Sequence, residues 1–311
     1  KCLYTLRILL IIIVAEIIVY RMKQNNHQKQ RQLQSLHVRL LRLLISGPGR
    51  WMPSLACYWV WRFWTSTYRF TAPAREITWR KQAKQSFIKQ PGSHEQKICV
   101  YQWGEGPVIL LVHGWNGRAT QLAASVDGLV AAGYKVIGFD APGHGQSDGN
   151  QTHIIEVCEI MAELNELYGP VHGIIAHSFG VPCSVLALNE SIKPEKIVCI
   201  SSPLSVHWLL DKFCEHLECP ASVKQAIERK MKKQFGKDIW PRLKTDELAK
   251  TLTCPALIIH DRNDSNIPWE HGQTLSDHWP DSRLLLTDRL GHRRILHNPT
   301  VIKQIVTFFS D

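Results

Sequence analysis

The chain has 311 residues, which is enough for one large α/β domain with appendages. Its formal net charge of +10 is unevenly distributed, because residues 1–90 carry 16 Lys and Arg against only Glu16 and Glu76. Residues 91–311 carry 21 basic and 25 acidic residues. A nucleic-acid enzyme needs a basic surface around its site, so this distribution argues against that class and favours an N-terminal arm that meets anionic lipid.

The cysteines show no disulfide framework. There are nine of them, an odd number without framework spacing, which predicts a reducing compartment. Cys214 and Cys219 flank a Glu-His-Leu-Glu segment, but no second ligand pair follows at zinc-like spacing. We therefore predict neither a bound metal nor a cofactor.

The N-terminal segment predicts a membrane anchor. Leu3–Tyr20 is almost wholly apolar, interrupted by Arg7 and Glu16, and about 20 apolar residues cross a bilayer. No small-residue cleavage site follows, so residues 1–23 are interpreted as an anchor rather than a signal peptide. More basic residues follow the segment than precede it, which predicts a membrane-associated protein with its C-terminal part in the cytoplasm. A buried N-terminal extension is the alternative.

Residues 24–90 are interpreted as a basic, Trp-rich linker and helical arm. Residues 24–34 are polar, and residues 36–45 place apolar residues on one helical face. Residues 51–70 contain eight aromatic residues beside Arg62 and Arg69, a composition typical of a membrane interface. A helix that packs this aromatic face on the main domain is equally consistent with the pattern.

Residues 91–311 predict an α/β domain with a mainly parallel, doubly wound sheet, because continuous apolar runs alternate with longer helical segments. The expected strands are Ile98–Trp103, Val108–Val112, Val136–Phe139, Gly173–Ala176, Ile197–Ile200, Ala256–His260 and Arg283–Thr287. The expected helices are Arg118–Ala132, Thr152–Leu167, Phe179–Asn189, Trp269–Trp279 and Thr300–Ser310. The first two strands are close enough to pair as a hairpin. Residues 203–252 contain helical patterns only and predict a cap inserted over the sheet edge.

A candidate nucleophile follows one of the buried strands. Ser178 stands between this strand and a helix, with Ala176 two residues before it and Gly180 two residues after it. A sharp strand-to-helix turn brings neighbouring backbone close together and therefore requires small residues at these positions. Pro182 suits the first turn of the following helix, where its missing N–H costs nothing.

A serine nucleophile needs a base that is oriented by an acid. His292 follows the last expected strand and is the candidate base, while Asp264 follows the sixth strand and is the candidate acid. Asp261 is the rival acid, whereas Asp140 is expected to hold its own turn.

Another strand supplies an oxyanion hole. It ends in His-Gly at residues 113–114, so the backbone N–H groups of Trp115 and Phe179 are predicted to form that hole.

Several residues near these positions have alternative interpretations. We predict that His177 packs against its neighbours or contacts the substrate rather than acting as the base. His113 and His144 are predicted to brace loops. Arg293 and Arg294 follow the base directly. They are interpreted either as a solvated pair or as a contact for an acidic substrate or a lipid headgroup.

Together these motifs resemble the α/β-hydrolase superfamily across about residues 90–311. The segments HGWNGRATQ, AHSFG and GHRRIL are similar to a bacterial branch of that superfamily, although Ala176 replaces its usual first glycine. The resemblance implies Ser178 as nucleophile, His292 as base and Asp264 as acid, with Trp115 and Phe179 as N–H donors.

The predicted function is a serine hydrolase that cleaves a carboxylic ester of a small or lipid-like substrate. Acyl transfer or thioester cleavage at the same triad is one alternative. A non-catalytic, membrane-tethered binding protein on the same fold is the other. The expected partners are the ester and, through the N-terminal arm, membrane lipid, but no nucleic acid.

Overall fold

The computed structural model describes residues 42, 45, 51–92 and 95–311. The predicted anchor at residues 1–23 and the polar linker at residues 24–34 lie outside the described residues. Among the residues that are described, no helix is long and apolar enough to cross a membrane. The chain divides into two units, one with Asp211–Met231 and the residues up to Trp61, the other with Arg62–Leu210 and Lys232–Asp311.

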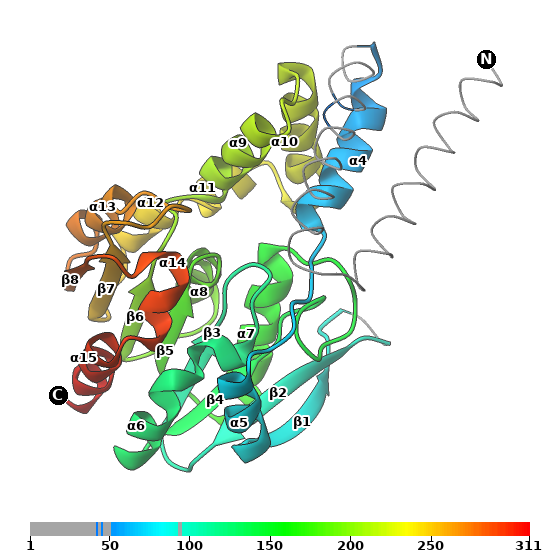
Figure 1. Ribbon diagram of the computed structural model, residues 1–311. Helices are drawn as coiled ribbons and strands as arrows, with labels where there is room; N and C mark the ends of the chain where they lie inside the picture. Colours follow the sequence, from blue (N-terminus) through cyan, green and yellow to red (C-terminus); the bar gives the residue numbers. More distant parts are fainter. Residues whose placement is uncertain (1–41, 43–44, 46–50, 93–94) are drawn as a thin grey trace. The chain divides into compact units, whose positions relative to one another are not determined.

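The larger unit is built on a sheet of eight strands (Figure 1). The strands are β1 (Lys84–Lys89), β2 (Lys97–Trp103), β3 (Val108–Val112), β4 (Lys135–Phe139), β5 (Val171–His177), β6 (Lys196–Ile200), β7 (Ala256–Asp261) and β8 (Ser282–Thr287). Their order is β1-β2-β4-β3-β5-β6-β7-β8. β2 pairs antiparallel with both of its neighbours, and all other pairs are parallel. The mainly parallel sheet predicted from the sequence is therefore present.

The start of the sheet differs from the sequence-based expectation. β2 and β3 do not form a hairpin, because β3 lies between β4 and β5 and β2 pairs with β1 and β4. All five residues of β3 are buried, so this strand occupies the interior of the sheet. β1 takes the edge with a largely exposed surface. The sheet thus begins at Lys84 and not near residue 91.

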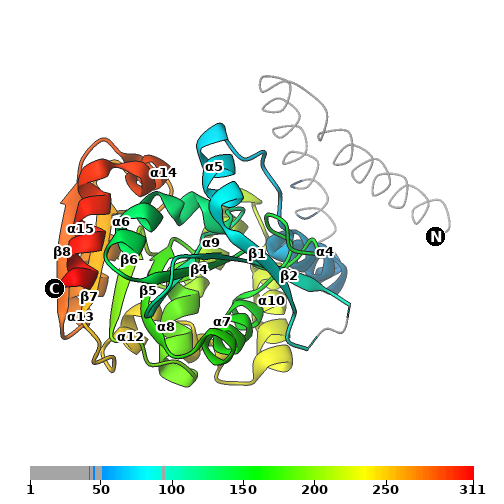
Figure 2. The same ribbon diagram turned by 90° about the horizontal axis from the view of Figure 1, so that it is seen from below.

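Helices cover both faces of the sheet. Figure 2 shows α6 (Val126–Ala131) and α15 (Pro299–Ser310) on one face, and α7 (Ile154–Tyr168) and α8 (Gly180–Glu190) on the other. α6 follows a 3-10 helix, η2 (Ala119–Ser125). The core joins buried strand residues such as Ile109 and Val198 to Leu129 of α6 and Phe308 of α15. Burial on both faces accounts for the continuous apolar runs of the strands.

The segment between β6 and β7 is helical, as predicted. It contains α9 (Val206–His216), α10 (Ala221–Phe235), α11 (Ile239–Arg242) and α12 (Thr245–Ala249). After β7 come α13 (Glu270–His278) and, following β8, the short α14 (Gly291–Arg294) and the 3-10 helix η3 (Ile295–His297). Before β1 lies α5 (Ala74–Gln82).

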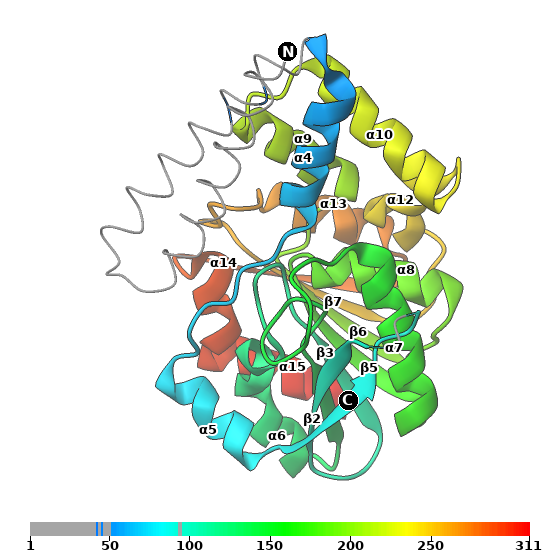
Figure 3. The ribbon, with the colours of Figure 1, turned by 90° about the vertical axis from the view of Figure 1, so that its right-hand side faces the viewer.

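The smaller unit contains the first part of α4 (Pro53–Thr65) beside residues of α10 (Figure 3). The ammonium of Lys230 lies 5.0 Å from the centre of the Trp61 ring. Val60 is fully buried, whereas Trp51 and Tyr58 are exposed. The aromatic segment predicted for residues 51–70 thus buries some of its side chains and exposes others.

Candidate active site

Ser178 occupies a strained turn between β5 and α8. Its φ is 53°, in the left-handed region that a residue with a Cβ rarely adopts. The Ser178 N–H donates to the Ile200 carbonyl oxygen at 2.9 Å, which fixes the turn to β6. A Cβ at Gly180 would collide with the carbonyl oxygens of Val112, the last residue of β3, and of His113, which follows it. This close approach is the physical reason for a glycine two residues after the serine.

Ser178, His292 and Asp264 form a chain of hydrogen-bonded side chains. The Ser178 Oγ lies 3.1 Å from Nε2 of His292, and Nδ1 of the same ring lies 2.7 Å from Oδ2 of Asp264. A carboxylate only accepts, so Nδ1 carries a proton and Nε2 is left to accept the serine hydroxyl proton. The arrangement can deprotonate Ser178 as a substrate is attacked.

Asp264 is held as a buried carboxylate. Its Oδ1 accepts backbone N–H groups of Asn266 at 2.8 Å and Ile267 at 3.1 Å. His260 Nε2, also buried, lies 3.5 Å from Oδ2. Burial by itself would raise the pKa of Asp264, but the hydrogen bonds from His260 and His292 outweigh it and hold that pKa well below its usual range. The acid therefore stays ionised beside the imidazole.

Asp261, the rival acid, has its oxygens occupied elsewhere. Oδ1 accepts the N–H groups of Asn263 and Gly291 at 2.9 Å. Oδ2 accepts the Thr287 hydroxyl at 2.7 Å and the Leu290 N–H at 3.0 Å. These bonds tie the end of β7 to the loop that carries His292. Asp261 is therefore placed to position that loop rather than to contact the imidazole.

The two expected oxyanion donors lie beside Ser178. Trp115 follows β3 and Phe179 follows Ser178, and their rings meet edge to face with centroids 5.1 Å apart. Within the part of the chain that the structure describes, neither backbone N–H donates to another protein group. Gly114 makes the approach possible, because a Cβ there would lie 3.0 Å from the Ser178 Cβ. Two free N–H groups are thus available for a developing oxyanion.

His177 connects the turn at Ser178 to the loop of His292. Its Nε2 lies 2.9 Å from the backbone carbonyl oxygen of His292, and the two ring centroids are 4.7 Å apart. Burial, helped by the nearby His292, lowers the pKa of His177 to about 3. The ring is therefore neutral near pH 7, and Nε2 carries the proton that it donates to the carbonyl. His177 also lines the cavity at Ser178, so packing and a substrate contact both stay predictions for this residue.

His113 and His144 brace neighbouring loops. Nε2 of His113 accepts the Ala141 N–H at 3.0 Å, and Nε2 of His144 accepts the Asn116 N–H at 3.0 Å. Burial lowers the pKa of His113 to about 4 and that of His144 to about 3, so both accept as neutral rings. Asp140 likewise holds its own turn, since its Oδ2 accepts the Gln146 N–H at 2.8 Å.

A cavity of about 180 Å³ opens at Ser178. Its lining residues are Gly114, Trp115, Asn116, Gln121, His177, Ser178, Leu209, Asn266, Ile267, His292 and Arg293. Arg294, which the sequence paired with Arg293, does not line the cavity. Its Nη2 donates to the Arg289 carbonyl oxygen at 2.8 Å. The structure thus separates two arginines that the sequence could not distinguish.

A larger cavity, of about 270 Å³, is not lined by Ser178, His292 or Asp264. Its buried charges are compensated within the protein. Arg118 Nη2 donates to Glu76 Oε1 at 3.1 Å, and the Thr120 hydroxyl donates to Glu76 Oε2 at 2.9 Å. These contacts attach α5 to the loop after β3 and leave the smaller cavity as the candidate active site.

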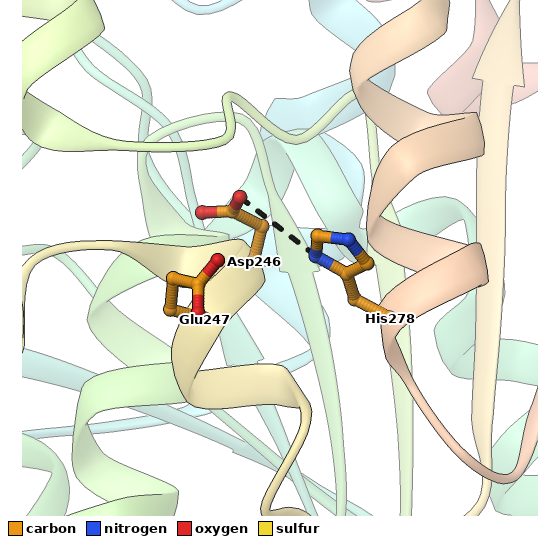
Figure 4. Close-up of side chains that lie close together, drawn as sticks. All are labelled: Asp246, Glu247 and His278. Atoms are coloured by element: carbon orange, nitrogen blue, oxygen red, sulfur yellow. Dashed lines mark ion pairs between the residues drawn. The ribbon is translucent and has the colours of Figure 1, made fainter.

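Asp246, Glu247 and His278 gather where α12 faces α13 (Figure 4). His278 Nδ1 lies 3.8 Å from Asp246 Oδ2, whereas both Glu247 oxygens accept Lys250 Nζ at 2.9 Å. None of the three lines the cavity at Ser178. With a lysine already bound to one carboxylate, we interpret the group as a surface ion-pair cluster.

Sequence reasoning missed two contributors to the site. His260 lies in an apolar strand and precedes Asp264 by four residues. This spacing is the feature of the sequence that could have indicated a contact between the two side chains. The hydrogen bond from His177 to the His292 carbonyl joins residues 115 positions apart, so no local sequence pattern predicts it.

Known proteins resemble this chain in sequence and in fold. Residues 106–235 match a family model described as "Serine aminopeptidase, S33". This match includes Ser178 but ends before Asp264 and His292.

Two curated relatives resemble the chain in sequence. Protein ABHD8 of Homo sapiens is 22% identical over 69% of this chain and 58% of its own length. The chain therefore spans little more than half of that relative. The uncharacterized hydrolase YraK of Bacillus subtilis is 26% identical over 50% of this chain and 57% of its own length.

Solved structures resemble the fold. The Pyrococcus furiosus esterase Pf2001 superposes with a TM-score of 0.59 at 17% identity, covering 78% of this chain and 97% of that one. At this level of identity the likeness concerns the fold alone.

Proposed function

The chain belongs to the α/β-hydrolase superfamily, and we propose that it is a serine hydrolase that cleaves a carboxylic ester through an acyl-enzyme on Ser178. The observation that carries the proposal is the unbroken chain from Ser178 Oγ to His292 and on to the buried Asp264. Each member lies just beyond the carboxyl end of a different strand, the edge at which α/β folds bind ligands.

Acylation follows from this geometry. As Ser178 Oγ attacks the ester carbonyl carbon, its proton moves to Nε2 of His292, and Asp264 stabilises the imidazolium. The carbonyl oxygen gains negative charge and accepts the N–H groups of Trp115 and Phe179. His292 then gives its proton to the departing alcohol oxygen, which leaves the acyl group on Ser178.

Deacylation repeats these steps with water as the nucleophile. His292 takes a proton from the water as its oxygen attacks the acyl carbon. The second tetrahedral intermediate uses the same two N–H donors. When it collapses, the proton returns to Ser178 Oγ and the carboxylic acid is released.

Names of similar structures support an ester substrate without fixing it. The Pyrococcus furiosus protein is called an esterase, and so is a protein from Exiguobacterium antarcticum with a TM-score of 0.57. An acyltransferase or a thioesterase would use the same residues, since only the acceptor or the leaving atom differs. A thioesterase domain is among the solved structures with a similar fold, which supports the thioesterase alternative.

Membrane association is part of the proposal. The apolar run at residues 3–20 supports an anchor in residues 1–23, with the hydrolase unit in the cytoplasm. A lipid-like ester would then be available at the membrane surface.

The test combines a reactive probe with an ester assay. A fluorophosphonate should label Ser178 in the purified protein, and Ser178→Ala should abolish both labelling and hydrolysis of 4-nitrophenyl esters. Loss of a triad nucleophile costs orders of magnitude in turnover. Ser191→Ala, at the exposed C-cap serine that follows α8, is the matched control and should keep both activities.

Wild-type protein that neither reacts with the probe nor turns over an ester would favour the non-catalytic binding protein instead. The melting temperature of Ser178→Ala, expected to stay close to that of the wild type, verifies that the variant folds.

A further inference from the structure

Arg293 presents an uncompensated positive charge at the candidate active site. It follows His292 in α14 and lines the cavity at Ser178, with its side chain exposed to solvent. Among residues 51–92 and 95–311, its guanidinium has no hydrogen-bond acceptor and no acidic partner. Arg262 provides a contrast, because it pairs with Asp288 at 3.1 Å.

The rest of the cavity does not neutralise this charge. None of the described residues that line the cavity is Asp or Glu. The nearest carboxylate in the mechanism, Asp264, has both oxygens engaged by His292 and backbone N–H groups. The other polar lining groups beyond the catalytic residues include the amides of Asn116, Gln121 and Asn266, which carry no charge.

The backbone N–H groups expected to form the oxyanion hole would also attract a negative charge. Trp115 lines the cavity and Phe179 follows Ser178 in the chain, and among the described residues the backbone N–H of neither donates to another backbone group. An anionic substrate group would therefore meet the Arg293 guanidinium and two N–H dipoles, with no carboxylate among the residues that line the cavity. A guanidinium can also hold a carboxylate or phosphate through two parallel hydrogen bonds, which gives orientation as well as attraction.

We propose that the substrate is a short ester carrying a carboxylate or phosphate group, and that the Arg293 guanidinium binds this anionic group. This inference rests on the proposed esterase function and adds the substrate class. The cavity of about 180 Å³ is smaller than the roughly 300–1,000 Å³ typical of drug-sized ligands, which favours a short chain on the enclosed side. The bond broken remains the ester bond, and the anionic group undergoes no chemistry.

The first experiment compares two pairs of esters, in each of which one member carries an anionic group that the other lacks. One pair is mono-4-nitrophenyl adipate and 4-nitrophenyl hexanoate, which places a carboxylate or a methyl group at the end of the acyl chain. The other pair is 1-butyrylglycerol 3-phosphate and 1-butyrylglycerol, which tests a phosphate on the alcohol side. For each pair the measured quantity is the ratio of kcat/KM for the anionic ester to that for the neutral ester.

The expected ratio favours the anionic ester in at least one pair, and the pair that does so identifies the source of the charge. Arg293→Gln should lower that ratio by about three- to tenfold, the range expected for a partly exposed charged hydrogen bond. Arg294→Gln is the matched control and should preserve it, because Arg294 does not line the cavity. Raising the salt concentration should reduce the wild-type preference through screening, a readout that needs no variant.

Two results would overturn the proposal. One is a wild-type enzyme that prefers the neutral member of both pairs, and the other is an equal loss of preference in Arg293→Gln and Arg294→Gln. Fluorophosphonate labelling of Ser178 in every variant separates these results from failure of the esterase proposal itself. Arg293→Lys, which retains the charge, should retain part of the preference and guards against a folding defect of the Gln variant.

Discussion

Two aspartates three residues apart serve the site in different ways. Asp264 meets the imidazole of His292 at 2.7 Å, whereas Asp261 accepts four donors from its own loop and from the loop of His292. The sequence favoured Asp264 but left Asp261 open, because both follow the same strand. What separates them is the direction of each side chain, which depends on tertiary contacts with residues 287–291.

Asp264→Asn should reduce kcat by about 10⁴-fold, the loss described for the corresponding change in a serine protease. The physical reason is that an amide NH₂ facing His292 Nδ1 would favour the tautomer that carries its proton on Nε2. That nitrogen could then no longer accept the proton of Ser178. The measurement is steady-state kinetics on a 4-nitrophenyl ester, with circular dichroism to confirm folding.

Asp261→Asn is the matched comparison and should act mainly on stability. Its amide NH₂ would face backbone N–H groups such as that of Leu290, leaving a buried donor unsatisfied at a cost of about 1–3 kcal/mol. The free energy of unfolding from urea titrations measures this loss. If Asp261→Asn lowers kcat more than Asp264→Asn does, the acid is misassigned.

At the scale of elements, the site depends on how closely α8 approaches β3. Gly180 begins α8 directly beside the carbonyl groups of Val112 and His113, and Ala176 is fully buried at the end of β5. The sequence identified both positions as small. The structure indicates that only the second one lacks room for a Cβ.

Gly180→Ala should therefore lower both kcat and the melting temperature, because its methyl group forces α8 and the Phe179 N–H away from β3. Ala176→Gly, on the other side of Ser178, removes only one buried methyl group and should keep kcat within a few-fold, at a stability cost of about 1 kcal/mol. Paired measurements of kcat and melting temperature test this difference. Equal kcat in the two variants would show that the backbone contact at Gly180 does not position the oxyanion donors.

The same elements show what the sequence could predict. All seven expected strands were present within a few residues, because burial on both faces leaves continuous apolar runs. β1 was missed, since an edge strand with mostly exposed residues resembles a loop. The single helix expected over Arg118–Ala132 is instead η2 followed by α6. The hairpin was wrong because strand order depends on partners distant in sequence.

For the candidate site, the positions of Ser178, Asp264 and His292 followed from strand ends, which meet at one edge of a parallel sheet. Their mutual distances and the partners that orient them could not be predicted from the strand ends. The roles of Asp261, His260 and His177 all depend on contacts made through folding, and Arg293 differs from Arg294 only in where its side chain lies. The catalytic roles of Ser178, Asp264 and His292 stay predictions until the variants are measured.

At the scale of the whole molecule, chemistry and charge are divided along the chain. The residues that line the Ser178 cavity all belong to the larger unit. Residues 1–90 hold the whole excess of positive charge, because residues 91–311 carry more acidic than basic residues. The proposed membrane attachment therefore uses residues that the proposed catalysis does not.

Deleting residues 1–35 should release the protein to the soluble fraction with its ester hydrolysis intact, because this removes the predicted anchor and leaves every proposed catalytic residue. Weak binding is expected to persist through the basic, Trp-rich residues 51–70, where Trp51 and Tyr58 are exposed and each basic residue near anionic lipid contributes about 1 kcal/mol. This remaining binding should decrease with salt. The measurement is membrane fractionation of both proteins in low and high salt, with an ester assay on each fraction. Full-length protein found entirely in the soluble fraction would contradict the anchor, and a folded but inactive truncation would show that the arm contributes to the site.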